Sequence, residues 1–115
     1  MDKDRPIEEV CALLKSLLKD DTNQIIFCTG RVEDYREKTI EQIKKILKGS
    51  KNIDIDSCLY MRPQGDFRKD FMVKRDLYKR MIFDGFKPVL VFEDNITVVE
   101  MWKEMGLKCI RVTRA

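Results

Sequence analysis

Three short polar clusters contain residue types that bind phosphate groups and divalent cations. They are Thr29-Gly30-Arg31, residues 68–74 and Glu93-Asp94. In the first cluster, a threonine hydroxyl and backbone N–H groups at a turn can bind phosphate oxygens, and Arg31 adds a two-pronged donor. In the third, Glu93 and Asp94 offer the hard oxygen ligands that Mg²⁺ prefers. Together the clusters predict a site for a phosphate and a magnesium ion.

The middle cluster supplies the positive charge that such a site needs. It contains Arg68, Asp70 and Lys74, and Lys74 can neutralise phosphate charge. Each cluster taken alone also has an ordinary structural interpretation. The three alternatives are a strand-to-helix turn, the solvated face of a helix, and acids that favour the start of a helix.

Composition excludes several classes of chemistry. The chain has no histidine, which removes catalysis by an imidazole base, and its four cysteines lie too far apart to predict a zinc site. Buried thiols in a reducing compartment are the expected state of these cysteines. The net charge of +3 permits an anionic ligand without requiring nucleic acid. An enzyme built on this chain would therefore use carboxylates, lysine, arginine or a metal.

The elements that must position these clusters alternate between helices and strands. Asp4 is expected to cap a helix that begins near Pro6 and repeats apolar residues at three- and four-residue spacing as far as Leu18. The apolar run at residues 24–28 predicts a strand buried on both faces, and residues 89–92 give the clearest strand pattern. Further helices are expected at residues 34–47, from 68 or 69 to the turn at 85–88, and at 98–105, with further strands at 57–61 and 108–112.

This order argues for an α/β fold with a parallel sheet covered by helices on both faces. In such sheets ligands bind outside the carboxyl ends of the strands, where the first and third clusters stand. The 115 residues suffice for one domain only, and we expect residues 1–115 to form it. The apolar runs are too short to span a bilayer and Met1 opens onto charges, so no membrane association and a cytoplasmic location are expected.

Two further stretches connect the clusters to a known family. Residues 64–74 read Gln-Gly-Asp-Phe-Arg-Lys-Asp-Phe-Met-Val-Lys, and residues 98–102, just after the paired acids, read Val-Val-Glu-Met-Trp. With the other clusters, this set resembles the phosphatases of the haloacid dehalogenase superfamily, in particular the 3′-phosphatase domain of bacteriophage polynucleotide kinase. The resemblance covers essentially the whole chain and is strongest from Gln64 onward. The ordinary interpretations of the clusters do not explain their coincidence in the family's order.

The resemblance implies a Rossmann-like three-layer sheet and a magnesium-dependent phosphatase whose substrate is a phosphorylated nucleic-acid end or nucleotide. It also implies the substrate-binding residues. Thr29 would hold a phosphate oxygen with Gly30 beside it, and Arg31 and Arg68 would bind the substrate.

The remaining roles implied by the resemblance belong to the catalytic and metal-binding residues. Asp70 would orient Lys74, and Lys74 would contact both the phosphate and the nucleophile. Asp94 would bind Mg²⁺. Glu93 stands where the family has aspartate, and its longer reach suits contact with the metal through a water molecule. Trp102 is expected to serve core packing only.

One part of the family's site is missing. These enzymes carry an Asp-x-Asp-x-Thr motif on the central strand, where one aspartate attacks phosphorus and the other acts as general acid and base. No such strand is present in the sequence, so the chain is expected to be N-terminally truncated relative to the family. Asp2-Lys3-Asp4 has the spacing of the two acids but no apolar run before it, and we interpret it as a helix cap rather than a displaced nucleophile.

The missing strand predicts a gap in the sheet between the strands that end at Cys28 and Phe92. Either these strands pair directly or another segment fills the gap, because unpaired central edges leave buried backbone groups without partners. A partner chain or self-association could supply the strand.

Two functions follow from this sequence. The first is a polynucleotide 3′-phosphatase domain that is incomplete or inactive as this chain alone. The alternative is a non-catalytic module, derived from such a phosphatase, that binds phosphate, nucleic acid or a protein.

Overall fold

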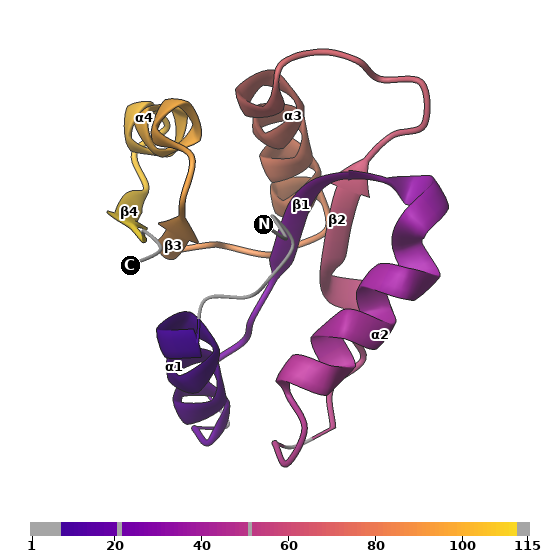
Figure 1. Ribbon diagram of the computed structural model, residues 1–115. Helices are drawn as coiled ribbons and strands as arrows, with labels where there is room; N and C mark the ends of the chain where they lie inside the picture. Colours follow the sequence, from indigo (N-terminus) through magenta and orange to yellow (C-terminus); the bar gives the residue numbers. More distant parts are fainter. Residues whose placement is uncertain (1–7, 21, 51, 113–115) are drawn as a thin grey trace.

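The computed structural model describes residues 8–20, 22–50 and 52–112, in which helices and strands follow the expected order (Figure 1). The helices are α1 (Glu8–Leu18), α2 (Arg36–Ile46), α3 (Asp70–Phe83) and α4 (Ile96–Glu104), with single-turn helices η1 (Glu33–Tyr35) and η2 (Asp56–Cys58). The strands are β1 (Phe27–Val32), β2 (Leu59–Arg62), β3 (Leu90–Glu93) and β4 (Lys108–Arg111).

The strands form two separate parallel sheets rather than the single sheet expected (Figure 1). β1 pairs with β2, beginning with Phe27 opposite Leu59, and β3 pairs with β4, beginning with Leu90 opposite Lys108. Neither arrangement expected at the gap, direct pairing of β1 with β3 or a filling strand, occurs in the described part of the chain. The sheet is therefore divided where the central strand was expected to be missing.

Helices cover both faces of the β1–β2 sheet. Successive residues of a strand point to opposite faces, so Leu59 and Met61 pack with α1 and α2, whereas Tyr60 packs with α3. The first of these two clusters comprises Leu18, Ile43, Leu47, Ile55, Leu59 and Met61, and the second comprises Tyr60, Val73, Leu77 and Met81.

Helix α4 packs on the β3–β4 sheet and joins it to α3. Its residues Val98, Met101 and Trp102 are buried, with Val91 of β3 packed against them. The ring of Tyr78 in α3 meets the Trp102 ring edge-on, with 5.8 Å between the ring centroids. Helix α3 is therefore the element that both sheets share.

The first strand differs from its prediction in position and burial. It was expected at residues 24–28 but begins at Phe27, because β2 offers ladder partners only from Leu59 onward. It also continues through Thr29-Gly30-Arg31, the cluster expected to end it, with an irregular register between Thr29 and Val32. All six residues of β1 are half-buried rather than buried on both faces. The open gap beside the strand accounts for this exposure.

Some expectations concern residues outside the described ranges. These are the cap at Asp4, the helix start near Pro6 and the interpretation of Asp2-Lys3-Asp4; α1 is described from Glu8. Within the described ranges, no helix has both the length and the apolar composition that crossing a membrane requires.

Candidate functional site

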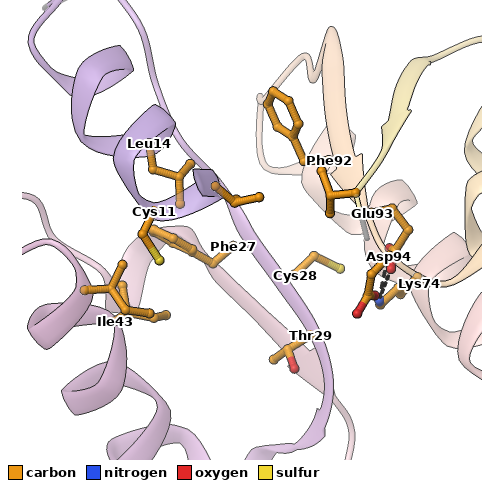
Figure 2. A pocket seen from close by; sticks show the side chains of 13 residues that line it. Cys11, Leu14, Phe27, Cys28, Thr29, Ile43, Lys74, Phe92, Glu93 and Asp94 are labelled. Atoms are coloured by element: carbon orange, nitrogen blue, oxygen red, sulfur yellow. Dashed lines mark hydrogen bonds and ion pairs between the residues drawn. The ribbon is translucent and has the colours of Figure 1, made fainter. Parts of the chain in front are cut away.

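Lys74 lies at the centre of the candidate site. It belongs to α3, is only 7% exposed, and lines the space between β1 and β3 (Figure 2). Its Nζ lies 3.1 Å from Oε1 of Glu93, the last residue of β3, and 3.3 Å from Oδ2 of Asp70, one turn earlier in α3. The lysine therefore connects the second sheet to the start of α3.

Glu93 is buried, and its carboxylate accepts hydrogen bonds from three directions. Lys74 Nζ donates to both oxygens, at 3.1 and 3.3 Å, and the indole Nε1 of Trp102 donates to Oε1 at 3.3 Å. The backbone N–H of Asn95 donates to Oε2 at 3.3 Å. A buried carboxylate needs such donors because its desolvation is costly. Trp102 therefore holds a site residue in addition to its expected role in core packing.

The surroundings of Lys74 keep its ammonium group charged. Burial by itself lowers the pKa of Lys74, but the carboxylates of Glu93 and Asp70 act in the opposite direction, and the net pKa lies above its ordinary value of 10.5. At neutral pH Lys74 is thus a fixed positive charge rather than a base.

Gly30 allows β1 to approach the start of α3 closely. A Cβ atom at this position would collide with the carboxylate of Asp70. The Gly30 carbonyl in turn accepts a hydrogen bond of 2.8 Å from Nε of Arg62. The absence of a side chain at Gly30 is therefore what permits Asp70 to stand between β1 and Lys74.

Arg62 is a site residue that the sequence analysis missed. Besides its bond to Gly30, its Nη1 donates to the backbone carbonyls of Asp66 and Arg68, at 3.0 and 2.6 Å. Its Nη2 lies 3.4 Å from Oδ1 of Asp70. One guanidinium group thereby joins β1, the loop at residues 63–69 and α3. The signal was available, because Arg62 is a polar residue at the carboxyl end of a parallel strand.

A cavity of about 380 Å³ opens beside Lys74, between β1 and β3. Thr29 lines it from β1, and Glu93 and Asp94 line it from the opposite side (Figure 2). The Thr29 hydroxyl accepts a hydrogen bond of 3.2 Å from the backbone N–H of Arg31. Four of the residues singled out in the sequence therefore meet at one cavity.

The two arginines expected to bind substrate lie outside this group. Nη1 of Arg31 donates to Oε1 of Gln42 in α2, at 2.6 Å. Nη2 of Arg68 lies 2.8 Å from Asp66 and 2.7 Å from Asp76. Neither arginine is among the residues that line the cavity, and the substrate-binding roles of both stay predictions.

The acidic residues do not form a metal cage by themselves. In residues 8–20, 22–50 and 52–112, no group of three or more histidine, cysteine, aspartate or glutamate residues could hold a metal ion. The oxygens of Glu93 already accept the hydrogen bonds described above, whereas Asp94 is exposed at the cavity. Since Mg²⁺ takes a nearly octahedral set of oxygens, it would need ligands beyond Asp94.

The whole chain, residues 1–115, matches the family described as the polynucleotide kinase PNKP phosphatase domain, of the haloacid dehalogenase type. The chain belongs to this family. The family resemblance drawn from the clusters is thereby confirmed, and it places the Lys74 cavity in a phosphatase-like domain associated with nucleic-acid end processing.

A viral protein is similar to this phosphatase-family chain. Over 87 residues, which are 75% of the chain, it is 31% identical to a protein of Autographa californica nuclear polyhedrosis virus described as a bifunctional polynucleotide kinase/RNA ligase. The matching segment is 12% of that protein's length. The chain thus spans a small part of the viral relative.

Proposed function

We propose that this chain forms the phosphate- and metal-binding part of a one-domain, magnesium-dependent phosphatase that removes the terminal phosphate from a nucleic-acid 3′ end. The arrangement of Lys74 carries the proposal. A buried ammonium group stands between Asp70 and Glu93, at the cavity that Thr29 and Asp94 line. A positive charge fixed beside this largely apolar cavity suits an anion, and family membership supports phosphate as that anion.

In this function some side chains bind the phosphate, and others hold those side chains in position. Lys74 neutralises the phosphate oxygens, and Asp70 and Glu93 hold its ammonium group in place. Thr29 donates its hydroxyl to a phosphate oxygen. Arg31 and Arg68 do not line the cavity, so each would exchange a present partner for the phosphate in order to bind it.

Asp94 would hold magnesium directly and Glu93 would do so through a water molecule, since Glu93 already accepts three donors. When bound, the ion would neutralise charge on the phosphate and on the attacking group. Its other ligands would come from the substrate and from a carboxylate outside the described residues.

The described site has no group suited to attack phosphorus. Burial raises the pKa of the Cys28 thiol to about 12, so this neighbouring cysteine stays protonated, and Asp70 and Glu93 are held by Lys74. We therefore propose that the attacking carboxylate belongs to a strand outside the described residues that enters the gap between β1 and β3. With that strand in place, the two sheets would join into the three-layer sheet of the family.

Phe67 supports a nucleic acid over a small phosphate ester as the substrate. Phe67 is 93% exposed. Arg62 donates hydrogen bonds to the backbone carbonyls of the residues on either side of it, Asp66 and Arg68. An aromatic ring presented on a loop that Arg62 holds in place offers a stacking surface for a nucleobase.

Phosphate release from a 3′-phosphorylated oligonucleotide in the presence of Mg²⁺ tests the phosphatase. We expect release from this chain extended at its N-terminus by an apolar strand ending in Asp-x-Asp, and none when Lys74→Ala is added. The same extension ending in Asn-x-Asn serves as the control for the carboxylates. An extended, folded chain that releases no phosphate would contradict the proposal.

A non-catalytic binding module is the second candidate. It is favoured by the pairing of Lys74 with two carboxylates of its own chain and by the lack of a third acid at the cavity among the described residues. This function predicts salt-sensitive binding of a phosphorylated oligonucleotide that Lys74→Ala and Arg31→Ala each weaken. Lys79→Ala, at an exposed position of α3, is the matched control. Undiminished binding by both site variants would exclude this site as the nucleic-acid contact.

A further inference from the structure

The side chain of Arg31 lies along one face of the segment that follows β1. Helices η1 and α2 come directly after β1 (Figure 1), and Tyr35, Thr39 and Gln42 recur there at spacings of four and three residues, which places them on one helical face. Nη1 of Arg31 donates to Oε1 of Gln42 at 2.6 Å and to the Thr39 hydroxyl at 3.4 Å. The guanidinium carbon lies 5.9 Å from the centre of the Tyr35 ring. We refer to Tyr35, Thr39 and Gln42 as the arginine-holding face.

Thr39 and Arg36 give the arginine-holding face a defined position. Thr39 is only 6% exposed, and its hydroxyl donates to the backbone carbonyl of Tyr35 at 2.8 Å. The proton of this hydroxyl is thereby used, which leaves its oxygen to accept the bond from Arg31. Arg36, the first residue of α2, donates to the backbone carbonyl of Leu59 in β2 at 2.9 Å. The start of α2 is therefore joined to the strand that pairs with β1.

The contacts that η1 and α2 offer Arg31 are with neutral groups. They are an amide, a hydroxyl and an aromatic ring. Arg68, the other arginine expected to bind substrate, contacts the carboxylates of Asp66 and Asp76 instead. A guanidinium group gains more when a phosphate replaces a neutral acceptor than when it replaces a carboxylate. Leaving α2 for a phosphate is therefore more favourable for Arg31 than leaving its carboxylates is for Arg68.

The backbone of Arg31 is fixed beside the cavity while its side chain extends to α2. The Arg31 N–H donates to the Thr29 hydroxyl at 3.2 Å, and Thr29 lines the cavity. The guanidinium group can therefore change partners by rotation about side-chain bonds, without movement of β1. The ammonium group of Lys74 differs in this respect, because Asp70 and Glu93 hold it at the cavity.

We propose that Gln42 and Tyr35 are positioning residues that hold the Arg31 guanidinium on α2 until a terminal phosphate enters the cavity and replaces them as its partner. Lys74 is the fixed cation of the site, and Arg31 closes on the phosphate after it has entered. The strength of the contact with Gln42 then sets the affinity for the phosphate, because that contact is lost on binding. The inference rests on the proposed function for the identity of the anion, and it adds two residues that do not touch the phosphate themselves.

Two substitutions of Gln42 should change phosphate binding in opposite directions. Gln42→Glu gives Arg31 a charged acceptor of the same size, which holds the guanidinium group more tightly, whereas Gln42→Leu removes the acceptor. For a 3′-phosphorylated dinucleotide and the whole chain, we expect the Kd from calorimetry to rise about two- to fivefold with glutamate and to fall about two- to fivefold with leucine. The unphosphorylated dinucleotide should show neither change. Weaker binding by both variants would indicate a structural role alone and would overturn the proposal.

An Arg31→Ala background separates the effect through Arg31 from general electrostatics. A glutamate at position 42 also repels phosphate at a distance, and that repulsion persists without Arg31, whereas the effect of partner exchange disappears. Lys74 remains to bind phosphate in this background, and both Gln42 substitutions should then change the Kd less than about twofold. Glu41→Gln, at the adjacent exposed position of α2, alters the charge by the same amount in the opposite direction and should also have an effect below about twofold. Equal effects with and without Arg31 would overturn the proposal.

A conservative pair of variants tests the ring of Tyr35. Tyr35→Phe keeps an aromatic ring beside the guanidinium group, whereas Tyr35→Leu removes it. Tyr35 is 50% exposed, so the fold should tolerate both changes, which thermal denaturation checks. We expect the phenylalanine variant to bind the phosphorylated dinucleotide as the wild type does and the leucine variant to bind it about twofold more tightly. Weaker binding by Tyr35→Leu would show that the ring contacts the dinucleotide itself and would contradict a positioning role.

The Nε–Hε group of Arg31 gives a direct measurement of the exchange. Its resonance can be observed by NMR in the ¹⁵N-labelled chain and assigned by its loss in Arg31→Lys. We expect this resonance to shift when the phosphorylated dinucleotide binds and to stay in place with the unphosphorylated one. An unchanged Arg31 resonance at saturation with the phosphorylated dinucleotide would overturn the proposal.

Kinetics of the chain extended by the Asp-x-Asp strand separate this inference from the proposed phosphatase. In an active chain, the Gln42 substitutions should change KM in the directions given for Kd and leave kcat within about twofold of the wild-type value. Phosphate release with a KM that neither substitution changes would contradict the exchange of Arg31 and leave the phosphatase intact. Opposite effects on binding without any phosphate release would contradict the phosphatase and leave the exchange intact. No binding of the phosphorylated dinucleotide at about 10 mM would contradict both.

Discussion

The β1–β2 and β3–β4 halves of the molecule differ in how their sheets are buried. In the first half, helices cover both faces, and Leu59, Tyr60 and Met61 of β2 are all buried. In the second half, α4 covers the sheet while Leu90 and Ile110 remain 45% and 48% exposed. Helices therefore cover the first sheet more completely than the second.

Lys74 therefore contributes both to the stability of the second sheet and to the candidate phosphate site. Two contacts in particular connect α3 to the β3–β4 half. One is the ion pair between Lys74 and Glu93, and the other is the packing of the Tyr78 ring on the Trp102 ring. The same ammonium group is the centre of the candidate phosphate site. Changes to the pair should therefore affect both the stability of the second sheet and ligand binding.

Lys74→Met should have the largest effect, because it leaves the buried Glu93 without its cation. We expect a loss of about 3–5 kcal/mol in the free energy of unfolding, measured by urea denaturation. Hydrogen exchange should show the β3–β4 amides opening before those of β1–β2. Adding Glu93→Gln should recover part of the loss. Lys79→Met, at an exposed position of α3, is the control, and an equal loss there would contradict the argument.

Gly30→Ala should destabilise the better-packed half, because the new Cβ atom meets the Asp70 carboxylate. Forcing an atom into a close-packed contact costs about 1–3 kcal/mol. Adding Asp70→Ala removes the clash, so the loss measured by urea denaturation should be smaller in that background than in the wild-type one. Additive losses for the two changes would show that the Cβ–carboxylate contact is not the cause.

Phe67→Ala should change binding rather than stability. A stacked base contributes about 1–3 kcal/mol, so loss of the ring should weaken oligonucleotide binding at least about fivefold. Phe83→Ala is the matched control, since Phe83 is 90% exposed and lies at the far end of α3. The two variants should unfold at similar urea concentrations. Equal binding by both would remove Phe67 from the proposed nucleic-acid contact.

Alkaline pH should lower the stability of both halves, because a different group loses its proton in each. The pKa of Lys74 is raised by its carboxylate partners against the effect of burial, and that of Tyr60 is raised to about 12 by burial and by its hydrogen bond to Asp84. Because both pKa values are higher in the folded chain, their contributions to stability are complete below about pH 10 and disappear as pH rises through the folded values. Tyr60→Phe should reduce this alkaline loss in urea titrations, and an unchanged pH profile would contradict the assignment.

Much of the fold was predictable because apolar periodicity is a local signal. The order of elements and the start of α4 after the acids follow from residues near one another in sequence. The start of β1 was not predictable in this way. Residues 24–26 are as apolar as a strand requires, but pairing begins at Phe27 because the ladder depends on where β2 begins. Strand limits of this kind are set by tertiary partners.

The candidate site was predictable to the extent that its residues follow strands. Thr29, Lys74, Glu93 and Asp94 meet at one cavity, as their predicted positions suggested, although Thr29 and Glu93 lie within β1 and β3 rather than after them. Arg62 stands at the carboxyl end of a strand, a position that the sequence shows, but its contacts with backbone carbonyls appear only in the folded chain. The pairing of Glu93 with Trp102 likewise appears only when β3 and α4 are folded together.

The open edges of β1 and β3 also have a consequence for handling the protein. Strand edges that have no partner among the described residues are templates on which any extended chain can add, including a partly unfolded copy of the same protein. Aggregation should therefore increase with protein concentration more steeply than the net charge of +3 alone would suggest. A segment that fills the gap between β1 and β3 would then protect the chain from edge-to-edge aggregation.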